Sequence, residues 1–63
     1  MPLVQLSLRA GRDAATKRRL IAELTDAVVR VTGVEAERVR VLLYELPDEH
    51  WGVGGVPAGE AKS

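Results

Sequence analysis

The chain has no cysteine, so no disulfide can support its fold. It has a single histidine, His50, without the companion ligands that a structural metal site needs. A domain of 63 residues buries roughly 60% of the surface of its unfolded chain, which leaves its stability marginal. With disulfides and a metal set aside, oligomerisation is the remaining way to stabilise so small a domain.

Net charge, long basic stretches and long apolar runs are also missing. Nine basic and nine acidic residues cancel, and the one basic cluster, at residues 17–19, is too short for a nucleic-acid surface. No apolar run could span a membrane, and the N-terminus lacks the charged and apolar regions of an export signal. We therefore expect a cytoplasmic protein that binds neither nucleic acid nor a membrane.

Hydrophobic periodicity predicts a single β-α-β unit that occupies residues 1–63 as one domain. Polar and apolar side chains alternate over residues 3–8, as in a half-buried strand, and residues 39–46 are rich in β-branched and aliphatic side chains. Between them, residues 14–32 have the apolar spacing of an amphipathic helix. The expected apolar stripe of this helix consists of Leu20, Ile21, Leu24, Ala27, Val28 and Val31.

Local signals mark the ends of these elements. Gly11 permits a tight turn, Asp13 suits a helix N-cap, and Gly33 suits the left-handed position after a helix. A connection of about thirty residues makes the two strands parallel. Glycines between apolar residues in segment 51–56 indicate a short C-terminal hairpin or a strand that docks on a neighbouring chain, followed by an irregular end at 57–63.

One helix covers only one face of such a sheet. Leu42 and Leu43 are adjacent in the second strand and must point to opposite faces. Whichever of the two does not meet the helix needs cover from another chain, which again predicts a tight oligomer.

The second residue is a proline, and removal of Met1 would expose its secondary amine as a base. An apolar surround, from residues such as Val4, Leu42 and Trp51, would lower the pKa of that amine toward neutrality. A neutral amine can move a proton next to a carbonyl group, but the developing enolate oxygen needs cationic support.

Two arginines are placed where that support could come from. Arg12 precedes a helix N-terminus, where the helix dipole disfavours a cation, so either it is a solvated loop residue or it has another task. Arg40 alternates with apolar residues in the second strand, where it either binds an anion or protects a sheet edge.

Taken together, these features resemble the 4-oxalocrotonate tautomerases over nearly the whole chain. The residues that carry the resemblance are Pro2, Gly11, Arg12, Arg40 and the segment Trp51-Gly52-Val53-Gly54-Gly55. The resemblance implies a cofactor-free isomerase that converts a 2-hydroxydienoate into a 2-oxo-enoate, with Pro2 as the general base. It also implies that Arg12 binds the distal carboxylate, and that Arg40 of another subunit holds the 2-oxo group and its neighbouring carboxylate.

The same resemblance implies a fold in which β-α-β units form dimers and the dimers form a hexamer, of one chain or of two. Trp51 stands where the family usually has a phenylalanine, which keeps the apolar bulk beside the proline and changes the pocket size. Aromatic catabolism, with 2-hydroxymuconate as substrate, is the usual setting of the family.

Arg9 departs from the usual tautomerase pattern and leaves two interpretations open. It resembles the first arginine of the Arg-Xaa-Xaa-Arg pair of the related haloacrylate dehalogenases, where it would form a double carboxylate clamp with Arg12. Alternatively, it is a solvated arginine at a strand end. Those dehalogenases activate water with a carboxylate where this chain has Val53, so Glu45 or Glu49 would have to replace it.

Hydrolytic dehalogenation is therefore the second candidate activity. A third possibility is a catalytically silent oligomerising subunit, because a retained Met1 would make the nitrogen of Pro2 an amide, which cannot act as a base.

Overall fold

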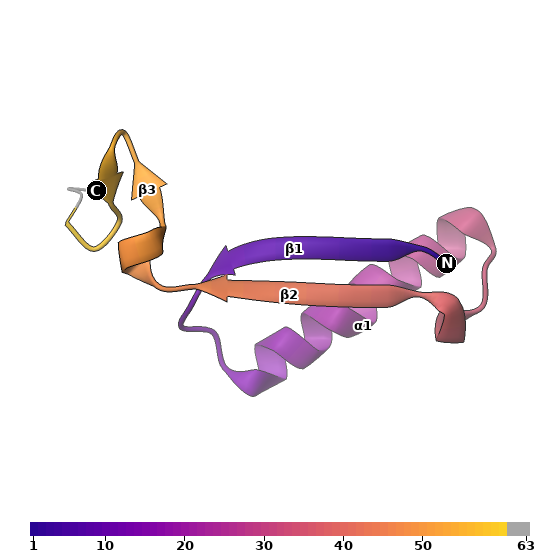
Figure 1. Cartoon of the computed structure of the whole chain (residues 1–63). Coiled ribbons are helices and arrows are strands. Elements are labelled where there is room, and N and C mark those ends of the chain that lie inside the picture. The colour runs from indigo at the N-terminus through magenta and orange to yellow at the C-terminus, as the bar shows by residue number, and fades with distance from the viewer. Residues whose placement is uncertain (61–63) are drawn as a thin grey trace.

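The computed structural model describes residues 1–60, which form a β-α-β unit followed by a small hairpin (Figure 1). The elements are β1 (Leu3–Arg9), α1 (Ala14–Thr32), η1 (Ala36–Arg38), β2 (Arg40–Leu46), η2 (Asp48–His50), β3 (Gly52–Val53) and β4 (Val56–Pro57). Strands β1 and β2 are parallel, with Leu3 opposite Arg40 and Arg9 opposite Leu46, whereas β3 and β4 are antiparallel. The predicted architecture of two parallel strands, one long helix and a C-terminal hairpin is confirmed.

Helix α1 begins and ends where its capping residues predict. The Asp13 side chain accepts a hydrogen bond from the Thr16 backbone N–H at 2.8 Å, and this bond lowers the pKa of the Asp13 carboxyl below its ordinary value. At the other end, Gly33 has a φ of 79° and donates its N–H to the Val29 carbonyl at 2.9 Å. Glycine has no Cβ and adopts this left-handed conformation with little steric strain, so the helix can end at Gly33.

Helix α1 covers one face of the sheet, behind the strands in Figure 1. Lys17 on the helix pairs with Glu45 on β2 at 2.9 Å, so the residues that alternate with Glu45 also face the helix. That face is the less exposed one and contains Val4, Leu6, Leu8, Val41 and Leu43. Among the residues described, the apolar core amounts to Leu8 and Val39, at 9% and 8% exposure.

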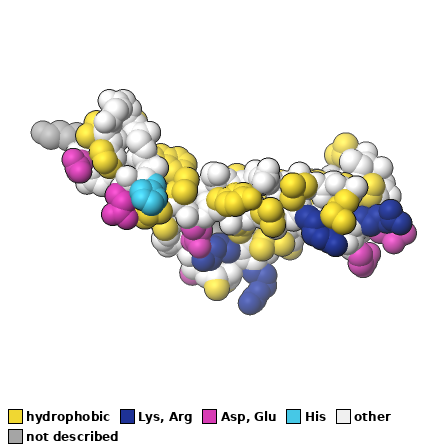
Figure 2. Space-filling model, viewed as in Figure 1, with side chains coloured by type: hydrophobic (Ala, Val, Ile, Leu, Met, Phe, Trp, Pro, Cys, Tyr) yellow, Lys and Arg dark blue, Asp and Glu magenta, His cyan; other side chains and the backbone are white. Residues whose placement is uncertain are grey.

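The opposite face of the sheet is uncovered. Leu3, Leu42 and Tyr44 remain 54%, 42% and 43% exposed, and hydrophobic side chains follow the strands in the space-filling view (Figure 2). The Gln5 side-chain amide donates to the Tyr44 hydroxyl at 3.0 Å on this face. The alternation predicted that either Leu42 or Leu43 would be left uncovered, and Leu42 is the one that the helix does not cover.

Two details of the sequence prediction were wrong on helix α1. Ile21 and Val31 were placed in its buried stripe, but they are 43% and 84% exposed. A helix of 19 residues is about 28 Å long, whereas a strand of seven residues extends about 23 Å, so the last helical turn, which contains Val31, extends beyond the sheet. Ile21 lies about 100° around the helix from Leu20, at the edge of the apolar stripe. Within residues 1–60, no helix combines the length and apolarity needed to cross a bilayer.

The end of the chain is also more ordered than predicted. Pro57 pairs with Gly52 in the hairpin, and the Ala58 N–H donates to the Trp51 carbonyl at 2.7 Å. The irregular end therefore begins later than residue 57, and residues 61–63 lie outside the described part of the chain.

Candidate active site

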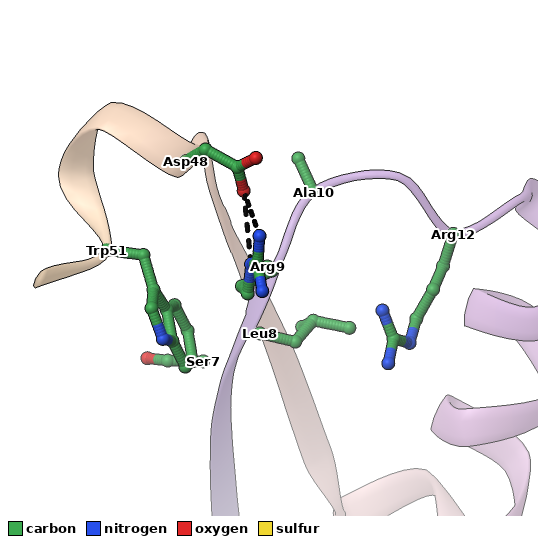
Figure 3. A pocket seen from close by; sticks show the side chains of 7 residues that line it. All are labelled: Ser7, Leu8, Arg9, Ala10, Arg12, Asp48 and Trp51. Atoms are coloured by element: carbon green, nitrogen blue, oxygen red, sulfur yellow. Dashed lines mark hydrogen bonds and ion pairs between the residues drawn. The ribbon is translucent and has the colours of Figure 1, made fainter. Parts of the chain in front are cut away.

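A concave pocket lies at the C-terminal end of β1 and has a volume of about 420 Å³ (Figure 3). The wall of the pocket is formed by strand β1, the loop after β1, η2 and the residue that follows η2. The lining residues are Ser7, Leu8, Arg9, Ala10, Arg12, Asp48 and Trp51. Because the C-terminal ends of parallel strands meet at one edge of a sheet, the chain that follows β1 and the chain that follows β2 converge here.

Arg9 and Asp48 form an ion pair inside this pocket. Arg9 Nε and Nη2 both donate to Asp48 Oδ1, at 3.1 and 2.8 Å. Both side chains remain about half exposed. Neither interpretation of Arg9 drawn from the sequence, the clamp or the solvated residue, included this partner.

Arg12 extends from the loop before α1 into the same pocket (Figure 3). Gly11, with a φ of 124°, allows the turn that places it there. Within residues 1–60, Arg12 makes no hydrogen bond and no ion pair with another side chain. Its guanidinium is therefore available to an anion from outside the chain.

Trp51 forms the apolar wall of the pocket, and the backbone fixes its position. Its N–H donates to the Asp48 carbonyl at 3.1 Å, and its own carbonyl accepts the Ala58 N–H of the hairpin. The hairpin thus holds the indole beside β1. The three candidate residues Arg9, Arg12 and Trp51 are brought together by the fold of one chain.

Pro2 and Arg40 lie at the opposite end of the sheet. The Arg40 N–H donates to the Pro2 carbonyl at 3.0 Å, which extends the parallel ladder by one step. The Arg40 side chain turns back along its own chain, where Nη1 donates to the Glu37 carbonyl at 2.7 Å. Pro2 and Arg9 are seven positions apart along an extended strand, a distance of about 23 Å.

The five candidate residues therefore form two groups in one chain, one at each end of β1. Val4 and Leu42 lie near the Pro2 end, since Val4 follows two residues later and Leu42 pairs with Gln5. Trp51 lies at the far end, so the indole of the same chain does not contribute to the surround of Pro2.

The two carboxylates considered for water activation, Glu45 and Glu49, do not line this pocket of the single chain. Glu45 faces the helix and pairs with Lys17, and Glu49 does not line the pocket. Asp48 does line it, and sequence reasoning missed this residue. Among the described residues, no group of three His, Asp or Glu side chains is arranged to hold a metal ion.

Comparison with known proteins identifies the family. Residues 2–61 match the family described as "Tautomerase enzyme". The chain is 48% identical to "Probable tautomerase RSp0893" of Ralstonia nicotianae, over 98% of this chain and 89% of the relative. It is 42% identical to the 2-hydroxymuconate tautomerase of Pseudomonas putida, over 95% of each.

The fold agrees with this relationship. A heterohexameric 4-oxalocrotonate tautomerase from Chloroflexus aurantiacus superposes with a TM-score of 0.90, at 31% identity, over 98% of this chain and 100% of that one. A family match over nearly all of the chain and relatives of this identity leave one assignment: the chain belongs to the tautomerase family, whose members are isomerases.

Proposed function

We propose that the protein is a cofactor-independent keto–enol tautomerase acting on a small anionic 2-hydroxydienoate, with 2-hydroxymuconate as the first substrate to test. The observation that carries this proposal is the pocket in which an available arginine, Arg12, lies beside an aromatic wall, Trp51, in a tautomerase-family chain with proline at position 2. The similar enzyme of Pseudomonas putida is named for this substrate.

In the proposed reaction, the secondary amine of Pro2 accepts the proton of the 2-hydroxyl group and delivers a proton to a carbon of the diene. The enol thereby becomes a 2-oxo-enoate, and no proton is gained or lost overall. Arg12 binds the distal carboxylate, and Arg40 of a further subunit stabilises the negative charge that develops on the 2-oxygen. Both arginines act through charge and bidentate geometry, for which a guanidinium is suited.

The working site requires more than one copy of the chain. Pro2 and the Arg12 pocket are separated by about 23 Å along β1, which a six-carbon dienoate cannot bridge. A substrate held by Arg12 can therefore meet only the Pro2 of a neighbouring subunit. In such an assembly the Trp51 that lies beside this Arg12 can also provide the apolar surround that the incoming Pro2 lacks in its own chain.

The surface of the single chain supports this assembly. Its accessible area is 4923 Å², whereas a compact monomer of this mass exposes about 3,950 Å². The excess of about 1,000 Å² matches the area that one partner contributes to a stable interface, and Leu3, Leu42 and Tyr44 lie exposed on the uncovered face of the sheet. We propose dimers that assemble into a hexamer, of one chain or, as in the Chloroflexus relative, of two.

Catalysis by Pro2 also requires the removal of Met1. Met1 is 83% exposed, so a processing enzyme can reach it. The mass of the intact protein purified from cells tests this step directly, since a mass without methionine is required for a free secondary amine.

The decisive assay follows the ultraviolet absorbance of 2-hydroxymuconate with methionine-processed protein and with the Pro2→Ala variant. General-base catalysis contributes about 10²–10⁴-fold to rate, so the variant should lose kcat/KM by that factor. An unchanged rate in Pro2→Ala would rule out the mechanism, whatever the turnover of the unaltered protein.

A further inference from the structure

The pocket contains two guanidinium groups and one carboxylate, so its formal charge is +1 rather than +2. Arg9 and Arg12 contribute the positive charges, and Asp48 contributes the negative one. An arginine pair would suit a doubly charged anion, whereas the pocket as it stands suits a single carboxylate.

The Arg9 guanidinium is engaged on one of the two edges that a carboxylate could use. Nε and Nη2 both donate to the same oxygen of Asp48, and the Nε edge is one of the two edges that a carboxylate can approach with paired bonds. A substrate carboxylate would have to displace Asp48 from this edge. Asp48 belongs to the same chain as Arg9, so it competes with a substrate carboxylate at a high effective concentration.

Asp48 is also held in place by its backbone. Its carbonyl accepts the N–H groups of Trp51 and Ala58, at 3.1 and 3.2 Å. An ion pair as exposed as this one contributes little to folding stability. Its main consequence is therefore the charge that it removes from the pocket.

We propose that Asp48 is a specificity-determining residue that holds Arg9 away from the substrate, so that Arg12 alone receives the carboxylate at this end of the site. The pocket then selects substrates with one negative charge at their distal end and disfavours those with two. This inference rests on the proposed function for the identity of the ligand as a carboxylate, but its test does not depend on turnover.

The fluorescence of Trp51 measures binding directly, because Trp51 is the only tryptophan of the chain and lines the pocket. The probe is muconate, a dienedioate without the reactive 2-hydroxyl group. It is titrated at low salt into the methionine-processed oligomer and into the variants Asp48→Asn and Arg9→Gln/Asp48→Asn. Asparagine nearly matches aspartate in size and leaves the backbone bonds of residue 48 in place.

Asp48→Asn should bind muconate about fivefold more tightly, because the pocket charge rises to +2 and Arg9 becomes available. The double variant has the same pocket charge as the unaltered protein and keeps Arg12, so its Kd should stay within about twofold of the original. If Arg9 instead binds substrate directly, the double variant loses about tenfold or more in affinity.

A tenfold loss in the double variant, an unchanged Kd in Asp48→Asn, or no saturable binding of muconate to any of the three proteins would overturn the inference. The proposed reaction is refuted by a different result, namely turnover of 2-hydroxymuconate that does not depend on Pro2. Pro2-dependent turnover together with a tenfold weaker double variant would refute the role of Asp48 and leave the tautomerase function intact.

Discussion

Replacing Leu42 with glutamate should break the assembly without touching the Arg12 pocket. Leu42 lies on the uncovered face of the sheet, 42% exposed, beside Leu3 at 54%. The exposed areas of the two side chains add up to about that of one fully exposed leucine. Burying this area in an interface stabilises the assembly by about 1.5–3 kcal/mol per subunit.

Leu42 contributes about 0.6–1.3 kcal/mol of this free energy per subunit, and the substitution removes it. Because a twofold interface contains Leu42 of both subunits, the dimer loses this amount twice. The dimer Kd should therefore rise by about ten- to seventyfold from lost apolar contact alone. Burial of the new carboxylate adds to this, because an unpaired charge is strongly disfavoured in an apolar interface.

Sedimentation velocity over a range of micromolar concentrations measures the effect. The matched control is Val31→Glu, which places the same charge on a helix residue that is 84% exposed. Leu42→Glu should sediment as a smaller species and the control as the full assembly. An unaltered assembly in Leu42→Glu, or a folded monomer in the original protein, would refute the argument from the exposed sheet face.

Two further predictions concern the substrate arginine and the helix cap. Arg12→Ala should lower kcat/KM for 2-hydroxymuconate by about ten- to a hundredfold, which is the loss expected for a charged hydrogen-bonding partner. The control variant Arg18→Ala removes the same charge from the exposed side of α1 and should leave kcat/KM unchanged. Equal losses in the two variants would count against a specific role for Arg12. The pKa of Asp13 is lowered in the folded state by its bond to Thr16, so its contribution is complete above the ordinary pKa and is lost as pH falls from about 4 through the lowered value. Circular dichroism melts should show Asp13→Ala less stable than the original protein at neutral pH and the difference vanishing at strongly acid pH; a difference that persists in acid would contradict this role.

The parts of the fold that depend on near neighbours were predictable from the sequence. The N-cap bond joins Asp13 to Thr16, three residues away, and Gly33 ends the helix through its own backbone conformation. The alternation of Leu42 and Leu43 likewise predicted that one of the two would lie uncovered, because strand geometry points adjacent side chains to opposite faces. Which one it is depends on where the helix packs, and the sequence left that open.

Distant pairings were not predictable. Arg9 and Asp48 are 39 residues apart, and they meet only because the register sets Arg9 opposite Leu46 and the chain turns at Pro47 into η2. Side-chain type alone does not reveal such a contact, so the carboxylate in the pocket was missed. The separation of Pro2 from Trp51 likewise depends on the tertiary fold, because Pro2 precedes the start of β1 and the chain after β2 brings Trp51 to the other end of that strand.

The central claim, that Pro2 of one subunit acts on a substrate held by Arg12 of another, is tested most directly by mixing two variants that are each strongly impaired. Pro2→Ala and Arg12→Ala chains are unfolded together, refolded as an equimolar mixture and assayed with 2-hydroxymuconate, beside each variant and the original protein refolded alone. Because a shared site draws the two residues from different chains at random, the mixture should recover about a quarter of the original activity. A mixture no more active than its separately refolded components would contradict a site shared between subunits.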